Sequence, residues 1–195
     1  MMGKLVCRIF YMKIKAIFIL LTALLISWGN AEKFRGEDVY LKELAIIKKQ
    51  IPTATAMNLY EGLPHQTFEG DLLGKEMKRK DVVTYAKFPF YKKPFKLAKA
   101  DEASLRKLLT DAKTFGSFYP YNSTSPKNCG GFHPDYCIEL EVNKKKVHVL
   151  VCFGCHEVKI AHPEYKLYCN INRDAYKEFG RILKKYKKNR PARGK

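Results

Sequence analysis

The sequence predicts an α+β fold, a single domain in which an antiparallel β-sheet packs against helices on one face. Residues 138–142 alternate apolar and acidic side chains, which is the pattern of a half-buried strand. After a polar turn at residues 143–146, residues 147–151 begin a second strand with valine at every other position. Apolar residues at helical spacing in residues 40–51 and 101–112 indicate helices before this hairpin. Strands adjacent in sequence, with helices outside them, favour an antiparallel sheet with a helical layer.

The N-terminal half of the domain is predicted to alternate short helices and strands. The helix at residues 40–51 is expected to end at the proline that follows it. Residues 53–60 indicate a strand that leads into a Gly-Pro turn, and residues 69–80 indicate a short helix that ends in a basic cluster. Residues 82–91 are β-branched and aromatic, which predicts one strand. An aspartate at its first position can cap the next helix, at residues 101–112.

The C-terminal half is predicted to hold a long loop, the strand pair and a final helix. Residues 116–136 are rich in Gly, Pro, Ser and Asn, which predicts a loop. After a tight turn, residues 156–160 are expected to return as a third strand. A last helix is expected over residues 172–186, and the basic tail at residues 187–195 is expected to be disordered.

Residues 1–31 have the pattern of a secretory signal peptide. They carry four cations and no acid, an apolar run at residues 16–26, and small residues at the two positions that a signal peptidase reads. The apolar run is shorter than the roughly 20 residues that span a bilayer, so we expect no transmembrane segment after cleavage. Met12 offers an alternative start within this leader. We therefore expect an exported protein, periplasmic or extracellular, whose domain occupies residues 32–186.

The cysteine count adds a constraint on the exported chain. Five cysteines remain after cleavage, and an odd number of thiols cannot all pair within one chain. In an oxidising compartment the first hypothesis for any of them is a structural disulfide. The disulfide candidates are Cys129, Cys137, Cys152, Cys155 and Cys169. The sequence leaves their pairing open.

Two of these cysteines belong to the most informative motif, Cys152-Phe153-Gly154-Cys155-His156. Its letters match the attachment site of c-type haem, with both cysteines as thioethers and His156 as the axial ligand. A two-residue turn at Phe153-Gly154 would instead bring the α-carbons of Cys152 and Cys155 within about 7 Å, close enough for a disulfide or a shared metal. A thioredoxin-like centre is disfavoured, because β-branched residues rather than a helix follow the pair.

A zinc-like site is the main alternative to a disulfide. Zinc favours four nitrogen or sulfur ligands, and Cys129, His133 and Cys137 recur at four-residue spacing in the Gly-rich loop. Cys152 and Cys155 would complete such a site. The first expectation is nevertheless that the protein carries no cofactor, with zinc second and haem c third. His148, on a predicted strand, is expected to be a packing residue.

The chain is strongly basic, with a formal net charge of +18. Basic and aromatic residues that interleave would suggest nucleic-acid binding in a cytosolic protein, but export removes nucleic acids from the usual partners. Anionic envelope components and protein partners stay available. The lysines expected to contact such a partner lie in one turn and in the C-terminal run, and they are Lys144, Lys145, Lys146, Lys184, Lys185, Lys187 and Lys188.

Three segments of the chain resemble a group of uncharacterised exported bacterial proteins with no assigned activity. They are residues 59–65 (LYEGLPH), 129–136 (CGGFHPDY) and 151–157 (VCFGCHE). The resemblance covers most of the mature chain, and it implies that the three segments converge on one site. Similar proteins carry the Cys-Phe-x-Cys part without a following histidine. This implies that His156 is dispensable, which weakens the haem hypothesis.

Together these observations favour a non-catalytic exported domain, stapled by cysteines, whose basic surface contacts an anionic envelope component or a protein partner. A metal-binding protein that uses Cys152 and Cys155 is the second hypothesis. A monohaem c-type cytochrome is the third. No segment outside the cysteine motif carries a specific catalytic pattern, so we do not expect an enzyme.

Overall fold

The computed structural model describes residues 38–121 and 130–192. By its internal contacts the chain forms two units, residues 1–41 and 42–195. Of the first unit only residues 38–41 are described, and they are helical. The strands and all labelled helices belong to the second unit.

The second unit begins with helical residues 42–50, whose buried side chains include Leu44 and Ile47. This helix ends where the sequence predicts, because the next proline lies in the short 3₁₀ turn η1 (Ile51–Thr53). The other short elements are α2 (Gly70–Glu76), η2 (Ala112–Thr114) and η3 (Lys184–Tyr186).

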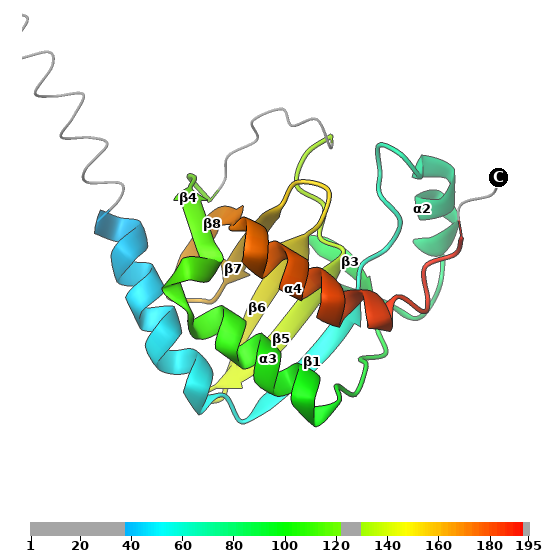
Figure 1. Ribbon diagram of the computed structural model, residues 1–195. Coiled ribbons are helices and arrows are strands. Elements are labelled where there is room, and N and C mark those ends of the chain that lie inside the picture. The colour runs from blue at the N-terminus through cyan, green and yellow to red at the C-terminus, as the bar shows by residue number, and fades with distance from the viewer. Residues whose placement is uncertain (1–37, 122–129, 193–195) are drawn as a thin grey trace, which may run out of the picture. The chain divides into compact units, whose positions relative to one another are not determined.

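A six-stranded antiparallel sheet forms the centre of this unit (Figure 1). Its strands lie in the order β1-β5-β6-β7-β8-β4, and every neighbouring pair is antiparallel. In chain order the strands are β1 (Ala56–Glu61), β4 (Phe115–Phe118), β5 (Tyr136–Val142), β6 (Lys145–Cys152), β7 (Glu157–Ala161) and β8 (Lys166–Ile171). A separate hairpin pairs β2 (Val82–Tyr85) with β3 (Phe88–Tyr91). The predicted α+β class is confirmed.

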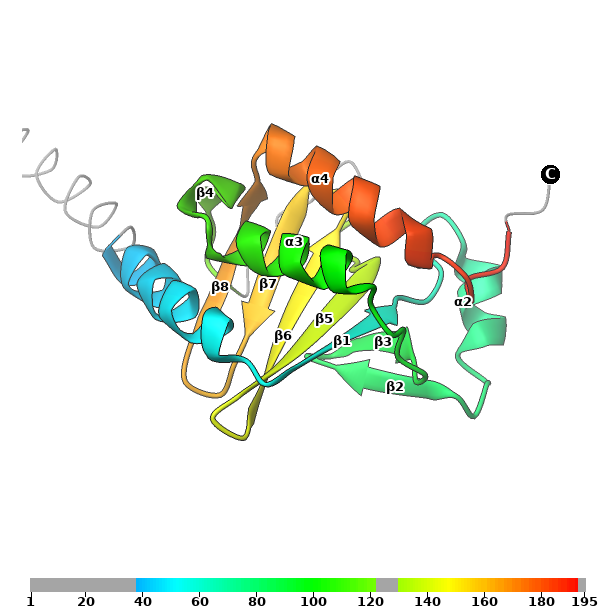
Figure 2. The ribbon, with the colours of Figure 1, turned by 60° about the horizontal axis from the view of Figure 1, so that its bottom comes forward.

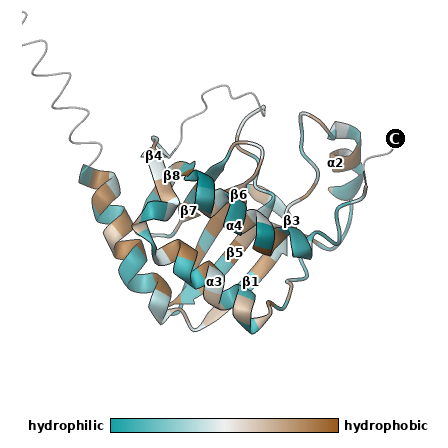
Figure 3. Cartoon of the chain, viewed as in Figure 1, coloured by the Kyte–Doolittle hydropathy of each residue, from teal (hydrophilic) through white to brown (hydrophobic). Residues whose placement is uncertain are grey.

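Two helices, α3 (Lys99–Thr110) and α4 (Arg173–Leu183), cover one face of the sheet (Figure 2). Hydrophilic and hydrophobic residues alternate along both helices, as expected for amphipathic helices (Figure 3). Their fully buried residues include Leu105 and Phe179, and the strands contribute buried residues such as Ile138 and Val149. Burial of each such side chain is worth about 1.5–3 kcal/mol, so this layer supplies most of the apolar core.

The β2–β3 hairpin lies on the opposite face of the sheet (Figure 2). Tyr60, Phe90, Cys137 and Leu150 form a buried apolar cluster there, and Phe132 packs against it. Strands β5 and β6 are therefore covered on both sides. This explains why even the acidic residue Glu139 in the middle of β5 is only 4% exposed.

Two stretches fold differently from the prediction. Residues 82–91 form two strands rather than one, because Ala86 and Lys87 adopt positive φ angles of 46° and 75° and reverse the chain. The predicted loop at residues 116–136 contains most of β4, which pairs with β8 at the edge of the sheet. Both features were missed because hairpin turns of this kind usually carry Gly or Asn, and β4 is short and contains a glycine.

Gly62, directly after β1, lies against the segment that leads into β5. Its N–H donates to the carbonyl oxygen of Asp135 at 2.7 Å. A Cβ atom added to Gly62 would lie 2.2 Å from the carbonyl oxygen of Pro134. A side chain at this position would therefore push the two segments apart.

Replacement of Gly62 by alanine is expected to destabilise the fold by about 3 kcal/mol, because the added methyl group meets backbone rather than a movable side chain. Gly74→Ala is the matched control, since nothing lies within 4 Å of its added Cβ in α2. That control should be neutral or stabilising by up to about 1 kcal/mol. Urea unfolding of both variants measures the difference, and equal midpoints would show that the approach at Gly62 can relax.

Candidate functional site

The three segments singled out in the sequence lie in contact with one another. Gly62 of the first segment donates its N–H to the carbonyl oxygen of Asp135 in the second, at 2.7 Å. His133 Nε2 lies 2.9 Å from the carbonyl oxygen of Leu63. The Asp135 carboxylate in turn accepts the N–H of Phe153, from the cysteine motif, at 2.8 Å. The end of β1, the start of β5 and the β6–β7 turn therefore meet at one end of the sheet.

The C-terminal segment is tied into this junction, so the predicted disordered tail is wrong for residues 187–190. The buried carboxylate of Glu61 accepts the backbone N–H groups of Lys188, Asn189 and Arg190 at 2.6–3.2 Å. Arg190 Nη1 lies 3.0 Å from Asp135 Oδ1, and its Nε and Nη2 donate to the carbonyl oxygen of Gly62. Residues 193–195 lie outside the described residues. The Arg190 side chain is 9% exposed and holds the junction together.

The turn in the cysteine motif is longer than predicted. Cys152 pairs with Glu157, so four residues connect β6 to β7 rather than two. The left-handed residue of this turn is His156, with a φ of 56°, and not Gly154. The expectation that His156 starts the third strand is therefore wrong by one residue. In this four-residue turn, Cys152 and Cys155 are not the opposed end residues that a two-residue turn would have brought together.

The cysteines do not form the predicted set of bridges. Cys137, Cys152 and Cys169 are buried free thiols, so their assignment as disulfide partners is wrong. Burial raises the pKa of all three thiols. Cys155 is disulfide-bonded, and its Sγ lies 3.4 Å from the carbonyl oxygen of Gly131. Cys129 lies outside the described residues.

The side chains of the motif do not fit a covalently attached haem. Haem attachment needs both sulfurs on one open side of the chain, next to the axial histidine. Cys152 is 1% exposed, and its Sγ is directed back to the N–H of Cys155 at 3.3 Å. The sulfur of Cys155 is already engaged in a disulfide. His156 is exposed and packs on the ring of Tyr176.

The residues proposed as zinc ligands are also not brought together. Cys137 lies in the apolar cluster under the β2–β3 hairpin, and His133 uses its Nε2 on the carbonyl oxygen of Leu63. Across residues 38–121 and 130–192, no group of three or more His, Cys, Asp or Glu side chains is placed to hold a metal ion. Among the described residues, Cys152 and Cys155 are therefore not joined by the two further ligands that a zinc site requires, and Cys129 lies outside these residues.

A cleft of about 670 Å³ lies beside the cysteine turn, where the β6–β7 turn, β8 and the start of α4 meet. One wall is aromatic: the rings of His156 and Tyr176 lie 4.0 Å apart. Asn170 of β8 and Ser117 of the edge strand β4 add polar groups. The volume falls within the range of about 300–1,000 Å³ that is usual for ligand sites.

The cleft is lined by basic and neutral residues. Arg173 and Lys177, one turn apart on α4, both line it, and none of the described residues that line it is acidic. Asp174 lies 3.5 Å from Lys177, but the two side chains are 96% and 64% exposed. Such a solvated pair contributes little and leaves Lys177 available. The cleft therefore favours an anionic group on a ligand with an apolar or ring-shaped part.

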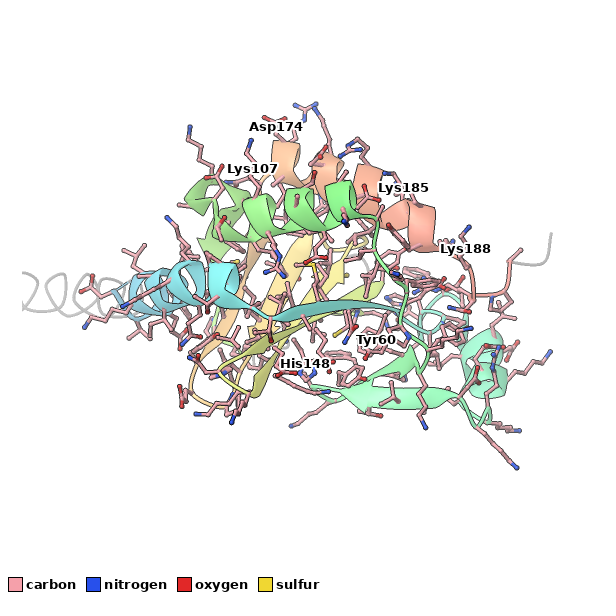
Figure 4. All side chains as sticks on the ribbon, turned by 90° about the horizontal axis from the view of Figure 1, so that it is seen from below. Tyr60, Lys107, His148, Asp174, Lys185 and Lys188 are labelled. Atoms are coloured by element: carbon pink, nitrogen blue, oxygen red, sulfur yellow. The ribbon has the colours of Figure 1, made fainter. Side chains whose placement is uncertain are left out.

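The lysines predicted to contact a polyanion do not form one surface. Residues 144–146 follow the end of β5, whereas residues 188–190 lie next to its start, and a seven-residue strand of about 20 Å separates them. Figure 4 shows Lys185 and Lys188 beyond the end of α4, away from His148 on the far side of the sheet. Several of these lysines are also engaged: Lys145 pairs with Glu164, Lys146 with Glu139, and Lys185 with Asp101.

The environment of the Glu139 side chain differs from the one that the sequence pattern predicts. The alternation in β5 predicts a solvent-facing acid, but its carboxylate lies 3.0 Å from Lys146 Nζ and 3.3 Å from His148 Nε2. Burial alone would raise the pKa of Glu139, and the hydrogen bonds from Lys146 and Asn58 outweigh it and lower that pKa. The His148 ring stacks on the Tyr85 ring, with 4.7 Å between the ring centres. His148 therefore both packs against Tyr85 and pairs with Glu139. The pairing partner of Glu139 could have been inferred only from its position opposite His148, and that position requires the register of β5 and β6 to be known.

No family model, no curated protein and no solved structure matches this chain. Within the described part of the chain, no helix is both long and apolar enough to cross a membrane. The geometry of the cleft therefore carries the functional interpretation.

Removal of the Arg190 side chain is expected to destabilise the protein by about 2–4 kcal/mol, because the Asp135 carboxylate would lose a partly buried partner. Lys187→Ala removes an exposed lysine three residues earlier and should change stability by no more than about 0.5 kcal/mol. Chemical denaturation of Arg190→Ala and Lys187→Ala provides the measurement. Equal stabilities would mean that the C-terminal segment is not held in solution.

Stability is expected to fall as the pH drops from about 7.5 to about 5.5. Burial lowers the pKa of both His133 and His148, so these side chains stay neutral in the folded protein while the unfolded chain takes up protons near pH 6.5. Proton uptake by the unfolded state favours unfolding. Burial also lowers the pKa of His162, so replacement of His133 and His148 by glutamine should reduce this pH dependence in thermal denaturation without abolishing it. If the double variant kept the same slope of stability against pH, His133 and His148 would not be its cause.

Proposed function

We propose that this protein is an exported, non-catalytic binding domain that holds an anionic group of an envelope component in the cleft between the β6–β7 turn and α4. The observation that carries the proposal is the lining of the cleft: Arg173 and Lys177 contribute cations, and the residues that the structure describes there include no acid. A carboxylate, sulfate or phosphate would gain charge-assisted hydrogen bonds there.

The rest of the cleft supports the same ligand class. The rings of His156 and Tyr176 offer an apolar wall, and Tyr176 is held in place because its hydroxyl donates to the carbonyl oxygen of Phe153 at 3.2 Å. Asn170 and Ser117 can exchange hydrogen bonds with hydroxyl groups. A ligand that combines an acid with a ring and hydroxyl groups matches all three features.

Export is supported by two observations. Residues 1–31 have the charge, apolar run and small residues of a signal peptide. Cys155 is disulfide-bonded, and structural disulfides persist in oxidising compartments outside the cytosol. An envelope polymer that carries acidic groups is a ligand that such a protein would meet.

Arg173→Ala and Lys177→Ala are each expected to weaken binding of tetragalacturonate about tenfold or more, the loss for one charge-assisted hydrogen bond. Lys144→Ala and Lys187→Ala remove exposed lysines that are not among the residues lining the cleft, and they should leave the affinity unchanged. Binding to the wild-type protein should also weaken as salt rises from about 0.05 M to about 0.5 M. Titration calorimetry measures these four single variants and the Arg173/Lys177 double variant. Equal affinity in the Arg173/Lys177 double variant and the wild-type protein would overturn the proposal.

A further inference from the structure

A second hollow lies directly beside the proposed ligand cleft. Its volume is about 570 Å³, and it is formed where the end of α3 and η2 meet the start of α4. The two hollows share Asn172 and Arg173, which line both. The Asn172 side chain is fixed in position, because its Nδ2 donates to the carbonyl oxygens of Lys113 and Phe115. Asn172 and Arg173 therefore border both hollows.

The two hollows differ in charge. The cleft beside the cysteine turn has basic residues and no acid among its lining residues. The second hollow contains Lys113 and the shared Arg173, but also Asp111 and Asp174. Asp174 is 96% exposed, and Asp111 is exposed while its Oδ1 accepts the N–H of Lys113 at 2.9 Å. An acidic group placed there would meet two carboxylates, whereas hydroxyl groups would find both acceptors and donors.

We infer that the two hollows form one extended site for an acidic glycan in which an acidic sugar occupies the cleft and a neutral, hydroxyl-rich sugar occupies the second hollow. This inference rests on the proposed function, because Arg173 and Lys177 must first hold the acid. The aromatic wall of His156 and Tyr176 packs on the ring of the acidic sugar. Lys113 and Asp111 exchange hydrogen bonds with the hydroxyl groups of its neighbour. A uniformly acidic chain is disfavoured by the carboxylates of the second hollow.

The test compares three ligands on the full mature protein by titration calorimetry: glucuronate, tetragalacturonate, and a hyaluronan tetrasaccharide that alternates uronate with a neutral amino sugar. The alternating tetrasaccharide is expected to bind most tightly. Lys113→Ala should weaken it about fivefold, the loss for one ordinary hydrogen bond, and should leave glucuronate binding unchanged. Arg173→Ala should weaken all three ligands.

Asp111→Asn is the discriminating variant, because asparagine keeps the side-chain oxygen that accepts the Lys113 N–H and removes the charge. It is expected to tighten tetragalacturonate while the alternating tetrasaccharide changes little. Two results would overturn the extended site and leave the proposed function standing: equal affinity for glucuronate and the tetrasaccharide, or tighter binding of tetragalacturonate than of the alternating chain by the unmodified protein. Failure of all three ligands to bind would instead overturn the proposed function.

Discussion

The carboxylate of Asp135 holds together the part of the molecule on which the cleft depends. One of its oxygens pairs with Arg190, and the other accepts the N–H of Phe153 at the start of the cysteine turn. The backbone carbonyl of the same residue accepts the N–H of Gly62. Because Arg190 belongs to the segment that follows α4 and Phe153 begins the β6–β7 turn, a single side chain ties this C-terminal segment to the turn that forms one wall of the cleft. A partly buried ion pair with further hydrogen bonds on both partners is costly to break on either side.

The cysteine motif shows how register decides the chemistry of a short pattern. Cys152 is the last residue of β6 and points to the sheet face that the β2–β3 hairpin covers, so its thiol is buried. Cys155 lies in the turn, near the carbonyl oxygen of Gly131, and is disulfide-bonded. His156 takes the left-handed conformation that closes the turn and is exposed beside Tyr176. The motif thus contributes a core residue, Cys152, a disulfide-bonded residue, Cys155, and part of the wall of the cleft, His156.

The large positive charge is not spread evenly over a binding surface. Lys146 and Lys185 neutralise buried carboxylates, those of Glu139 and Asp101. Lys159 is 8% exposed and places its ammonium group 4.3 Å from the ring centre of Tyr168 and 5.0 Å from that of Phe132. Such cation–π contacts hold the Phe132 segment on the sheet. The cations available to a ligand are those without such tasks, and Arg173 and Lys177 are two of them that line the cleft beside the cysteine turn.

The sequence by itself determined the α+β class, the helix before Pro52, the helices that became α3 and α4, and the β5–β6 hairpin, because their apolar periodicity is a local property. No local pattern showed that the segments around Gly62, Asp135 and Phe153 lie together; only the resemblance to other exported proteins implied it. Only the tertiary structure decided the chain reversal at Ala86, the burial of Glu139, the anchoring of Arg190 and the existence of the cleft. The last three of these depend on a partner in another element: His148 for Glu139, Asp135 for Arg190, and the β6–β7 turn for the residues of α4. A local pattern shows what a residue prefers, but the pairing register and the packing of remote segments decide what it meets.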